Sequence, residues 1–327
     1  SVIAIHSTRN GPALGGCRMA TYASTERAVQ DAIRLAQGMS YKAVMCGLPL
    51  GGGKAVIMKP SGAFNRRAII NSFAQFVHDL NGRYITSIDS GTSVEDLNWV
   101  AQHTAWVAGH TKGKRAGGDP SPYTARGVLK GMEAAIHYYL PNRRWLDLTV
   151  LIQGVGHVGY YLAKYLYERG AKIIVSDVSV TAAQRCAQEF NAQVVDVNQI
   201  YRTPCDVFSP CALGGVLTEE SVRLLPAKII AGSANNQLAN LAVIDTLKQC
   251  NIHYVPDYVL NAGGLIQVYC AHYELPMSEA DARIDEIYPR LLELFRQSTS
   301  EQKVPAEIVD KVANEKLNRQ EVILEPN

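Results

Sequence analysis

Two lysines twelve residues apart, Lys42 and Lys54, are the first candidates for chemistry in this chain. Lys54 follows three glycines, and glycine lets a backbone approach a ligand closely because it carries no Cβ. A lysine held against such a backbone loses part of its hydration, which favours the neutral form needed for acid–base work. A phosphate loop of the form GxxxxGK[ST] is excluded, because Leu48 replaces the first glycine and Ala55 follows the lysine. For this motif alone, an exposed lysine after a Gly-rich turn is an equally good interpretation.

A second motif is typical of dinucleotide binding. Gly154, Gly156 and Gly159 form GxGxxG between an apolar strand pattern and a helix pattern, and Asp177 ends the next strand. The glycines would bring the pyrophosphate to the helix N-terminus, where the dipole favours anions. Asp177 would bind the adenosine ribose and repel a 2′-phosphate, and no arginine follows in the next three residues. The motif therefore favours NAD over NADP.

Helices and strands must position these residues. Apolar residues at helical spacing predict helices over residues 23–37 and 65–80, with Lys42 on a loop between them and Lys54 on a strand. A short strand is predicted at residues 84–87, and Asp89 comes just after it. From residue 148 onward, short apolar strands alternate with helical stretches, which predicts a parallel sheet covered by helices.

The predicted fold class is α/β with two domains and the active site in the cleft between them. The run 109–123 is rich in Gly, Pro and basic residues and marks the boundary. Residues 1–116 would form the substrate-binding, catalytic and oligomerisation domain, with a C-terminal helix, 303–327, as a candidate to complete it. Residues 117–302 would form a Rossmann-type NAD domain with a doubly wound parallel sheet.

Composition excludes several functional classes. The chain is 47% hydrophobic and 19% charged with a net charge of +2, which predicts a soluble globular protein and does not indicate nucleic acid or a membrane surface as a partner. No apolar run reaches membrane-spanning length. The seven cysteines are scattered without a CxxC or a Cys/His cluster, so we expect reduced thiols, a cytoplasmic location and no metal.

Together these motifs resemble the glutamate/leucine/phenylalanine/valine dehydrogenase superfamily, and most closely its leucine, phenylalanine and valine branch. The resemblance runs in family order from residue 1 to about residue 270. The strings that carry it are GPALGGCRM (11–19), GMSYKAVMCGLPLGGGKAVI (38–57), SIDSGTSVEDL (87–97), GGDPSPYTARGV (117–128), QGVGHVG (153–159), PCALGGVL (210–217), IIAGSANNQL (229–238) and PDYVLNAGGLIQV (256–268). It implies NAD-dependent reversible oxidative deamination of an L-amino acid to its 2-oxo acid and ammonium, by a homo-oligomer.

The resemblance also implies roles for individual residues. Lys54 would activate the attacking water, and Asp89 would exchange a proton with the substrate amine. Lys42 would bind the substrate carboxylate, helped by the backbone of Gly15 and Gly16 and by the amide of Asn236. The residues implied in cofactor binding are Gly154, Gly156, His157, Val158, Gly159, Asp177, Thr124, Cys211, Ala212, Leu213, Ala234 and Asn236.

The resemblance leaves the identity of the amino acid open. Glutamate-specific members carry a lysine where this chain has Leu14, and an unpaired buried carboxylate costs several kcal/mol, so glutamate is disfavoured. A branched-chain aliphatic substrate, leucine first, is the main expectation; an aromatic one (phenylalanine or tryptophan) is the alternative, and a catalytically silent NAD-binding sensor is a remote one. The side-chain pocket is predicted from Leu14, Met39, Ser87, Ala108, Leu265 and Val268.

Overall fold

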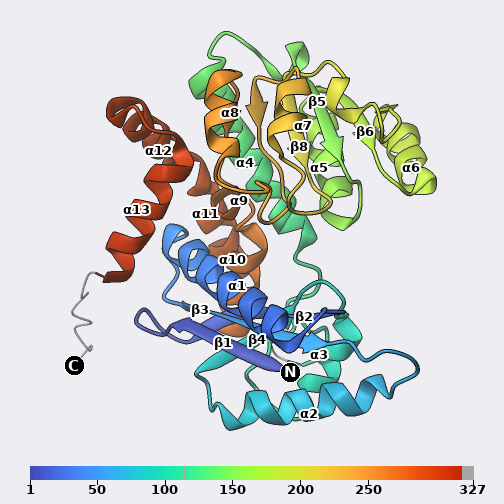
Figure 1. Cartoon of the computed structure of the whole chain (residues 1–327), viewed down its shortest axis with the longest axis vertical. Coiled ribbons are helices and arrows are strands. Elements are labelled where there is room, and N and C mark those ends of the chain that lie inside the picture. Colours follow the sequence, from blue (N-terminus) through green and yellow to red (C-terminus); the bar gives the residue numbers. More distant parts are fainter. Residues whose placement is uncertain (114, 319–327) are drawn as a thin grey trace. The chain divides into compact units, whose positions relative to one another are not determined.

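The structure is a computed structural model that describes residues 1–113 and 115–318. These residues form two compact units, which we describe separately (Figure 1). The first unit comprises Ser1–Ala116 together with the chain from Val309 onward, and the second comprises Gly117–Ile308. Of the predicted C-terminal segment 303–327, residues 319–327 lie outside the described residues.

The first unit is built on a four-stranded sheet. Its strands are β1 (Val2–Ser7), β2 (Ala13–Ala20), β3 (Gly51–Met58) and β4 (Tyr84–Ile88), in the spatial order β1-β3-β2-β4. Strand β1 runs antiparallel to β3, whereas β2 is parallel to both of its neighbours, β3 and β4. Strand β2 therefore separates β3 from β4.

Helices cover both faces of this sheet. They are α1 (Thr25–Met45), α2 (Arg66–Asp79) and α3 (Val94–Val100), and Figure 1 shows α1 and α2 on opposite sides of the strands. On β3, Val56 packs against Ala28 and Ala32 of α1. The neighbouring Ala55 belongs to the hydrophobic cluster that contains Phe73 of α2. Because side chains alternate along a strand, Lys54 lies on the face that α1 covers.

Helix α1 corrects one prediction. It continues past residue 37 to Met45, so Lys42 lies in the last turn of a helix and not on a loop. Gly38 interrupts the helical pattern in the sequence, because glycine costs about 1 kcal/mol in a helix interior. The residues on either side of Gly38 outweigh this cost, since Ala36 and Ser40 are buried and lie against Gly52 of β3.

The second unit contains a six-stranded parallel sheet, which confirms the predicted α/β fold. The spatial order is β10-β9-β8-β5-β6-β7. The strands are β5 (Thr149–Gln153), β6 (Lys172–Ser176), β7 (Gln193–Val194), β8 (Val207–Pro210), β9 (Ile229–Ile230) and β10 (His253–Tyr254). The strands are short, and β5, β6, β8 and β9 are largely buried, as expected for strands that are covered on both faces, whereas the edge strand β7 is exposed.

The helices of the second unit follow the predicted alternation. They are α4 (Ser121–Tyr139), α5 (His157–Glu168), α6 (Val180–Phe190), α7 (Glu219–Leu224), α8 (Val243–Gln249), α9 (Asp257–Leu260), α10 (Gly263–His272), α11 (Met277–Asp285) and α12 (Ile287–Glu301), with short 3₁₀ turns at Trp145–Asp147 and Ile200–Arg202. All ten residues of α10 are buried, which makes it an internal helix. The last helix, α13 (Pro305–Asn318), contacts α1 within the first unit, where Tyr41 Oη lies 2.9 Å from Asn314 Oδ1.

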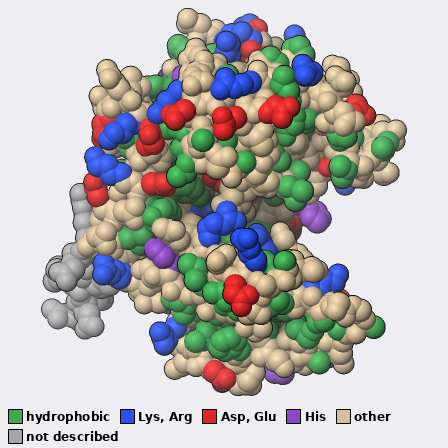
Figure 2. All heavy atoms as spheres, in the orientation of Figure 1, with side chains coloured by type: hydrophobic (Ala, Val, Ile, Leu, Met, Phe, Trp, Pro, Cys, Tyr) green, Lys and Arg blue, Asp and Glu red, His purple; other side chains and the backbone are tan. Residues whose placement is uncertain are grey.

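The surface carries charges of both signs. On the face drawn in Figure 2, Lys and Arg side chains are interspersed with Asp and Glu, which fits a net charge of +2. Within residues 1–113 and 115–318, no helix has both the length and the apolar character needed to cross a membrane.

Candidate active site

The first unit brings the predicted catalytic pair, Lys54 and Asp89, into direct contact. Lys54 Nζ lies 2.7 Å from Asp89 Oδ2, and the two side chains are only 8% and 15% exposed. The short distance and low exposure describe a charge-assisted hydrogen bond that is largely removed from water. An amine and a carboxylate in such contact can pass a proton between them, which is the chemistry that an acid–base site needs.

A glycine on the intervening strand allows this contact. Lys54 is on β3 and Asp89 follows β4, so β2 runs between them. Gly16 pairs with Ser87 of β4, and the pairing of Cys17 with Ala55 places Gly16 opposite Lys54. A Cβ at Gly16 would lie 2.7 Å from the Cβ of Asp89 and 2.6 Å from the carbonyl oxygen of Ile88. Any larger residue at this position would therefore separate the pair.

A tight turn after β4 fixes the backbone of Asp89. Thr92 Oγ1 accepts a hydrogen bond from the Asp89 N–H at 3.1 Å and donates to the Cys17 carbonyl of β2 at 2.8 Å. Gly91 adopts a positive φ of 80°, and a Cβ there would lie 1.9 Å from the Met19 carbonyl oxygen. The turn is thus held directly against β2. The capping box of Ser93 and Asp96 begins α3 just beyond it.

The electrostatic surroundings keep Asp89 ionised. Burial alone would raise the pKa of Asp89, but the nearby charges of Lys54 and then Arg18 outweigh it and lower the pKa below its usual value. The Cys17 thiol, on the adjacent position of β2, behaves oppositely, because burial raises its pKa far above the usual range. Cys17 is therefore a packing residue and not a nucleophile.

The remaining predicted residues of the first unit lie on β2, α1 and β4, except Ala108, which lies on the loop after α3. Leu14, on β2, is 2% exposed, and the backbone at Gly15 accepts a hydrogen bond from the Tyr84 hydroxyl. Ser87 and Ala108 are buried near each other, since the Ala108 N–H donates to the Thr86 carbonyl. Met39 and Lys42 are half-buried on the C-terminal half of α1.

The Gly-rich loop of the second unit has a shape that suits a dinucleotide. Gly154 has a positive φ of 90°, and a Cβ there would lie 2.6 Å from the Cβ of Ala212. A Cβ at Gly159 would lie 2.0 Å from the Gly154 carbonyl oxygen, so these two glycines are required by the protein itself. Gly156, the N-cap of α5, differs, because a Cβ there would meet no protein atom within 4 Å. The open space in front of an uncapped helix N-terminus fits a bound pyrophosphate.

Asp177 closes this loop from the end of β6. Its two carboxylate oxygens accept hydrogen bonds of 2.7 Å from the backbone N–H groups of Val155 and Ser179. The adjacent Val178 is 90% exposed and offers no cation. Next to the loop, His157 is exposed and Val158 half-buried.

Other predicted cofactor residues lie on loops that follow β8 and β9. Cys211 donates its backbone N–H to Gln153 of β5 at 2.7 Å, and burial raises the pKa of its thiol, which indicates an inert cysteine. Leu213 is 75% exposed and Ala212 exposed. Ala234 and Asn236 are on the loop after β9, and Thr124 is on α4.

Two residues of interest were missed in the sequence. Asn261 donates its amide to the Ser233 carbonyl and to Asn235 Oδ1, whereas its own Oδ1 is buried without a hydrogen-bond partner and could accept one from a ligand. Arg18 donates to Asp89 at 3.3 Å. Its position two residues after Gly16 on β2, on the same face of the strand, was the available signal.

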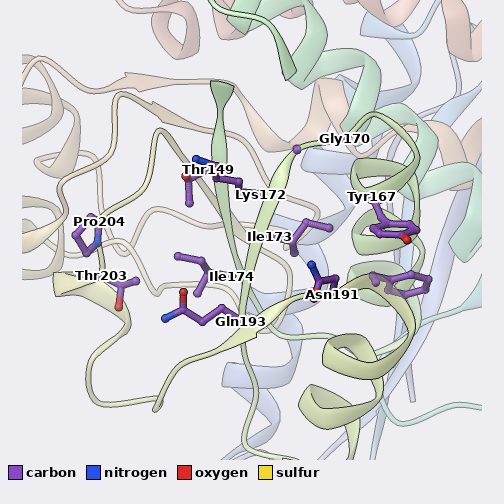
Figure 3. Close-up of a pocket in the computed structure, with 12 residues that line it drawn as sticks. Thr149, Tyr167, Gly170, Lys172, Ile173, Ile174, Asn191, Gln193, Thr203 and Pro204 are labelled. Carbon is purple, nitrogen blue, oxygen red and sulfur yellow. The ribbon is translucent and has the colours of Figure 1, made fainter. Parts of the chain in front are cut away.

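The pocket drawn in Figure 3 lies elsewhere in the second unit. It has a volume of about 660 Å³ and lies at the amino ends of β5 and β6, where its lining includes Thr149, Lys172 and Gln193. The Gly-rich loop follows the carboxyl end of β5. The pocket contains none of the predicted site residues.

Comparisons with known proteins identify the family of this chain. Residues 1–106 match the family model "Glu/Leu/Phe/Val dehydrogenase, dimerisation domain", and residues 176–315 match "Glutamate/Leucine/Phenylalanine/Valine dehydrogenase". The chain is 42% identical to leucine dehydrogenase from Geobacillus stearothermophilus over 97% of this chain and 86% of the relative. It is 39% identical to valine dehydrogenase from Streptomyces coelicolor, over 97% and 88%.

A solved structure is also similar over most of its length. The crystal structure of L-tryptophan dehydrogenase from Nostoc punctiforme has a TM-score of 0.83 and 36% identity, and the match covers 97% of this chain and 91% of that one. These relatives confirm the predicted enzyme class, an amino acid dehydrogenase, which implies a nicotinamide cofactor. The chain belongs to the Glu/Leu/Phe/Val dehydrogenase family.

Proposed function

We propose that this protein catalyses the NAD-dependent, reversible oxidative deamination of an apolar L-amino acid, with leucine and other branched-chain substrates preferred. The reaction converts the amino acid, NAD and water into the 2-oxo acid, ammonium, NADH and a proton. The observation that carries the proposal is the buried contact of 2.7 Å between Lys54 and Asp89. This pair provides an amine and a carboxylate in one desolvated site, as the two proton transfers of the reaction require.

Each residue of the pair has a separate task in the proposal. When bound, the nicotinamide supplies the acceptor for the hydride that leaves the substrate Cα. Asp89, whose pKa is lowered by Lys54 and Arg18 against the effect of burial, is the carboxylate that exchanges a proton with the substrate amino group. Lys54 is the base that takes a proton from the water that adds to the iminium carbon. The half-buried Lys42 provides the positive charge that binds the substrate carboxylate.

The loop geometry supports NAD as the cofactor. The unobstructed position of Gly156 leaves room for the pyrophosphate at the start of α5. Asp177 is held in place by two backbone N–H groups, which supports its proposed role of binding the adenosine ribose and repelling a 2′-phosphate. The other residues proposed to line the cofactor are His157, Val158, Gly154, Gly159, Thr124, Cys211, Ala212, Leu213, Ala234 and Asn236.

Pocket chemistry and relatives both support an apolar substrate. Leu14 and Ala108 are almost fully buried, and Ser87 adds one hydroxyl group. Leu265 and Val268, both buried on α10, are the other proposed determinants of the side-chain pocket, together with Met39. Similarity to the leucine and valine dehydrogenases, at 42% and 39% identity, supports an aliphatic substrate for this protein. The tryptophan dehydrogenase, at 36% identity, keeps an aromatic substrate as the second candidate.

The experiment is a panel of initial rates with leucine, valine, isoleucine, phenylalanine, tryptophan and glutamate, each with NAD and with NADP. We expect the highest kcat/KM with leucine and NAD. Tryptophan or phenylalanine as the best substrate would select the aromatic candidate, and glutamate would overturn the pocket argument. Lys54→Ala should lose about 10³-fold in kcat, within the range for removal of an acid–base group. Lys59→Ala, an exposed lysine just beyond β3, is the matched control and should keep its activity.

We also propose that the protein is a homo-oligomer. Support comes from the match of residues 1–106 to a family model described as a dimerisation domain. Light scattering coupled to size-exclusion chromatography should give a mass of at least twice the 35.7 kDa of one chain. A monomer at micromolar concentration would contradict this.

A further inference from the structure

The carboxylate of Asp89 has a second cationic partner besides Lys54. Arg18 Nε lies 3.3 Å from Asp89 Oδ2, the same oxygen that Lys54 contacts. Arg18 comes from the central strand β2, whereas Lys54 comes from β3, so the two cations approach the carboxylate from different strands. The Arg18 side chain is 22% exposed, which leaves it mostly shielded from water.

Arg18 is itself held by a carboxylate on α1. Its Nη1 donates to Asp31 Oδ2 at 3.0 Å. The Tyr22 hydroxyl donates to the same oxygen at 2.7 Å, and Arg34 Nη2 approaches Asp31 Oδ1 at 3.2 Å. Asp31 is only 17% exposed. Arg18 therefore lies between two half-buried carboxylates, with its guanidinium fixed at both sides.

We propose that Arg18 is a positioning residue for Asp89, and that Asp31, assisted by Tyr22, holds Arg18 in place. This inference rests on the proposed function only for the role of Asp89. The terminal torsion of an aspartate has a broad energy profile, so a single partner fixes its orientation poorly. A planar guanidinium that is anchored at a second point restricts that torsion. It also supplies a charge that cannot be lost by titration.

Ionisable groups from three strands surround Asp89. Lys54 faces it from β3 and Arg18 from β2. Two further groups interact with it electrostatically: the Cys17 thiol of β2 and the Tyr84 hydroxyl of β4, both with pKa values raised chiefly by burial. Neither of these carries charge near neutral pH. Loss of Arg18 thus removes one of the two cations that stabilise the carboxylate.

The chain offers a matched control in the same pocket. Arg18, Tyr22, Asp31 and Arg34 line an open cavity of about 600 Å³ together with Arg27 and Gln30. Arg27 is exposed, and in the described part of the chain it forms an ion pair with neither Asp31 nor Asp89. Arg27→Gln therefore removes the same charge from the same cavity without touching the proposed contact.

The first test is kinetic. Arg18→Gln should lower kcat for the best amino acid at least tenfold and change KM less than threefold, because orientation of a reacting group affects the transition state more than ground-state binding. Arg18→Lys should recover part of the loss, and Arg27→Gln should stay within twofold of wild type. Since the cavity is open beside Arg18, millimolar guanidinium should partly restore Arg18→Ala. Unchanged kcat in Arg18→Gln would overturn the proposal.

The second test needs no enzymatic activity. The full-length protein is labelled with ¹³C at the aspartate carboxyl carbons, the Asp89 signal is assigned with Asp89→Asn, and its titration is followed by NMR. In Arg18→Gln, Asp89 should titrate about one pH unit higher than in the wild-type protein, which is the low end of the range for loss of an opposite charge at this distance. Asp31→Asn should shift it in the same direction by less, and Arg27→Gln should leave it unchanged.

The two tests separate the two proposals. A wild-type protein without amino acid dehydrogenase activity would refute the proposed function, while the titration would still decide whether Arg18 controls Asp89. An active wild type whose Asp89 titrates identically in Arg18→Gln would refute only the positioning role. If Arg18→Gln fails to fold, as judged by circular dichroism, Asp31→Asn and Arg18→Lys decide by the same criteria.

Discussion

Replacement of Gly16 by alanine tests the steric argument for the catalytic pair. The added Cβ would lie 2.7 Å from the Asp89 Cβ and 2.6 Å from the Ile88 carbonyl oxygen, whereas ordinary contacts begin at 3.4 Å. The end of β4 must therefore move away from β2 by about 0.8 Å. Such overpacking destabilises a protein by about 1–3 kcal/mol.

The same movement should stretch the contact of 2.7 Å between Lys54 and Asp89. Misplacement of a catalytic group by about 1 Å can cost about 10²-fold in rate, so we expect kcat of Gly16→Ala to fall at least tenfold. The assays are urea unfolding followed by circular dichroism and steady-state kinetics at saturating substrate.

Gly38→Ala is the matched control for stability. A Cβ at Gly38 meets no atom within 4 Å, and the residue lies inside helix α1. The same substitution should therefore stabilise the protein by about 0.5–1 kcal/mol. If Gly16→Ala unfolds at the same urea concentration as wild type and keeps its kcat, the reasoning about the close strand approach is wrong.

Three further predictions follow from the geometry. Gly156→Ala should fold with wild-type stability but bind NADH at least tenfold more weakly, as measured by fluorescence quenching. Gly159→Ala should unfold at a lower urea concentration, because its Cβ would lie 2.0 Å from a carbonyl oxygen. Asp96→Ala should cost about 1–2 kcal/mol near neutral pH, because it removes an acceptor of the α3 capping box and a pair of 2.6 Å with Arg66, whose side chain is 36% exposed. Burial raises the pKa of Asp96, but Arg66 lowers it by more, so the folded-state pKa lies below its usual value. The difference in unfolding free energy between wild type and Asp96→Ala should therefore be constant above about pH 4 and shrink as the pH falls through this lowered pKa. A difference that does not change with pH would contradict the assignment. Asp177→Asn should raise kcat/KM with NADP relative to NAD by about tenfold, and an unchanged ratio would argue against charge repulsion at this position.

Local signals predicted much of the second unit. The order of strand, Gly-rich turn and helix around Gly154 is encoded in a single continuous segment, and the structure has β5 and α5 on either side of it. The boundary of α1 was not predictable in this way. Its continuation past Gly38 depends on burial of Ser40 against β3, a contact that the helix pattern of the segment does not reveal.

The partners within the catalytic site were also only partly predictable. Motif resemblance identified Lys54 and Asp89, but their contact requires the order β3-β2-β4, which follows from tertiary packing. Arg18 reaches Asp89 only because the register of β2 against β4 puts them on one face of the sheet. The local pattern places Arg18 on the same strand face as Gly16, but it does not reveal the pairing with Asp89, which is 71 positions away.

Strand β2 has a consequence for protein engineering. Its odd-numbered residues Ala13, Cys17 and Met19 belong to the cluster packed with α2, while Gly16 and Arg18 lie on the other face, beside Asp89. A one-residue insertion or deletion would exchange the two sets and destroy core and site together. Mutant libraries should therefore keep the length of this strand fixed. Indels belong instead in exposed loops such as the one at Gly62, where a Cβ would have nothing within 4 Å.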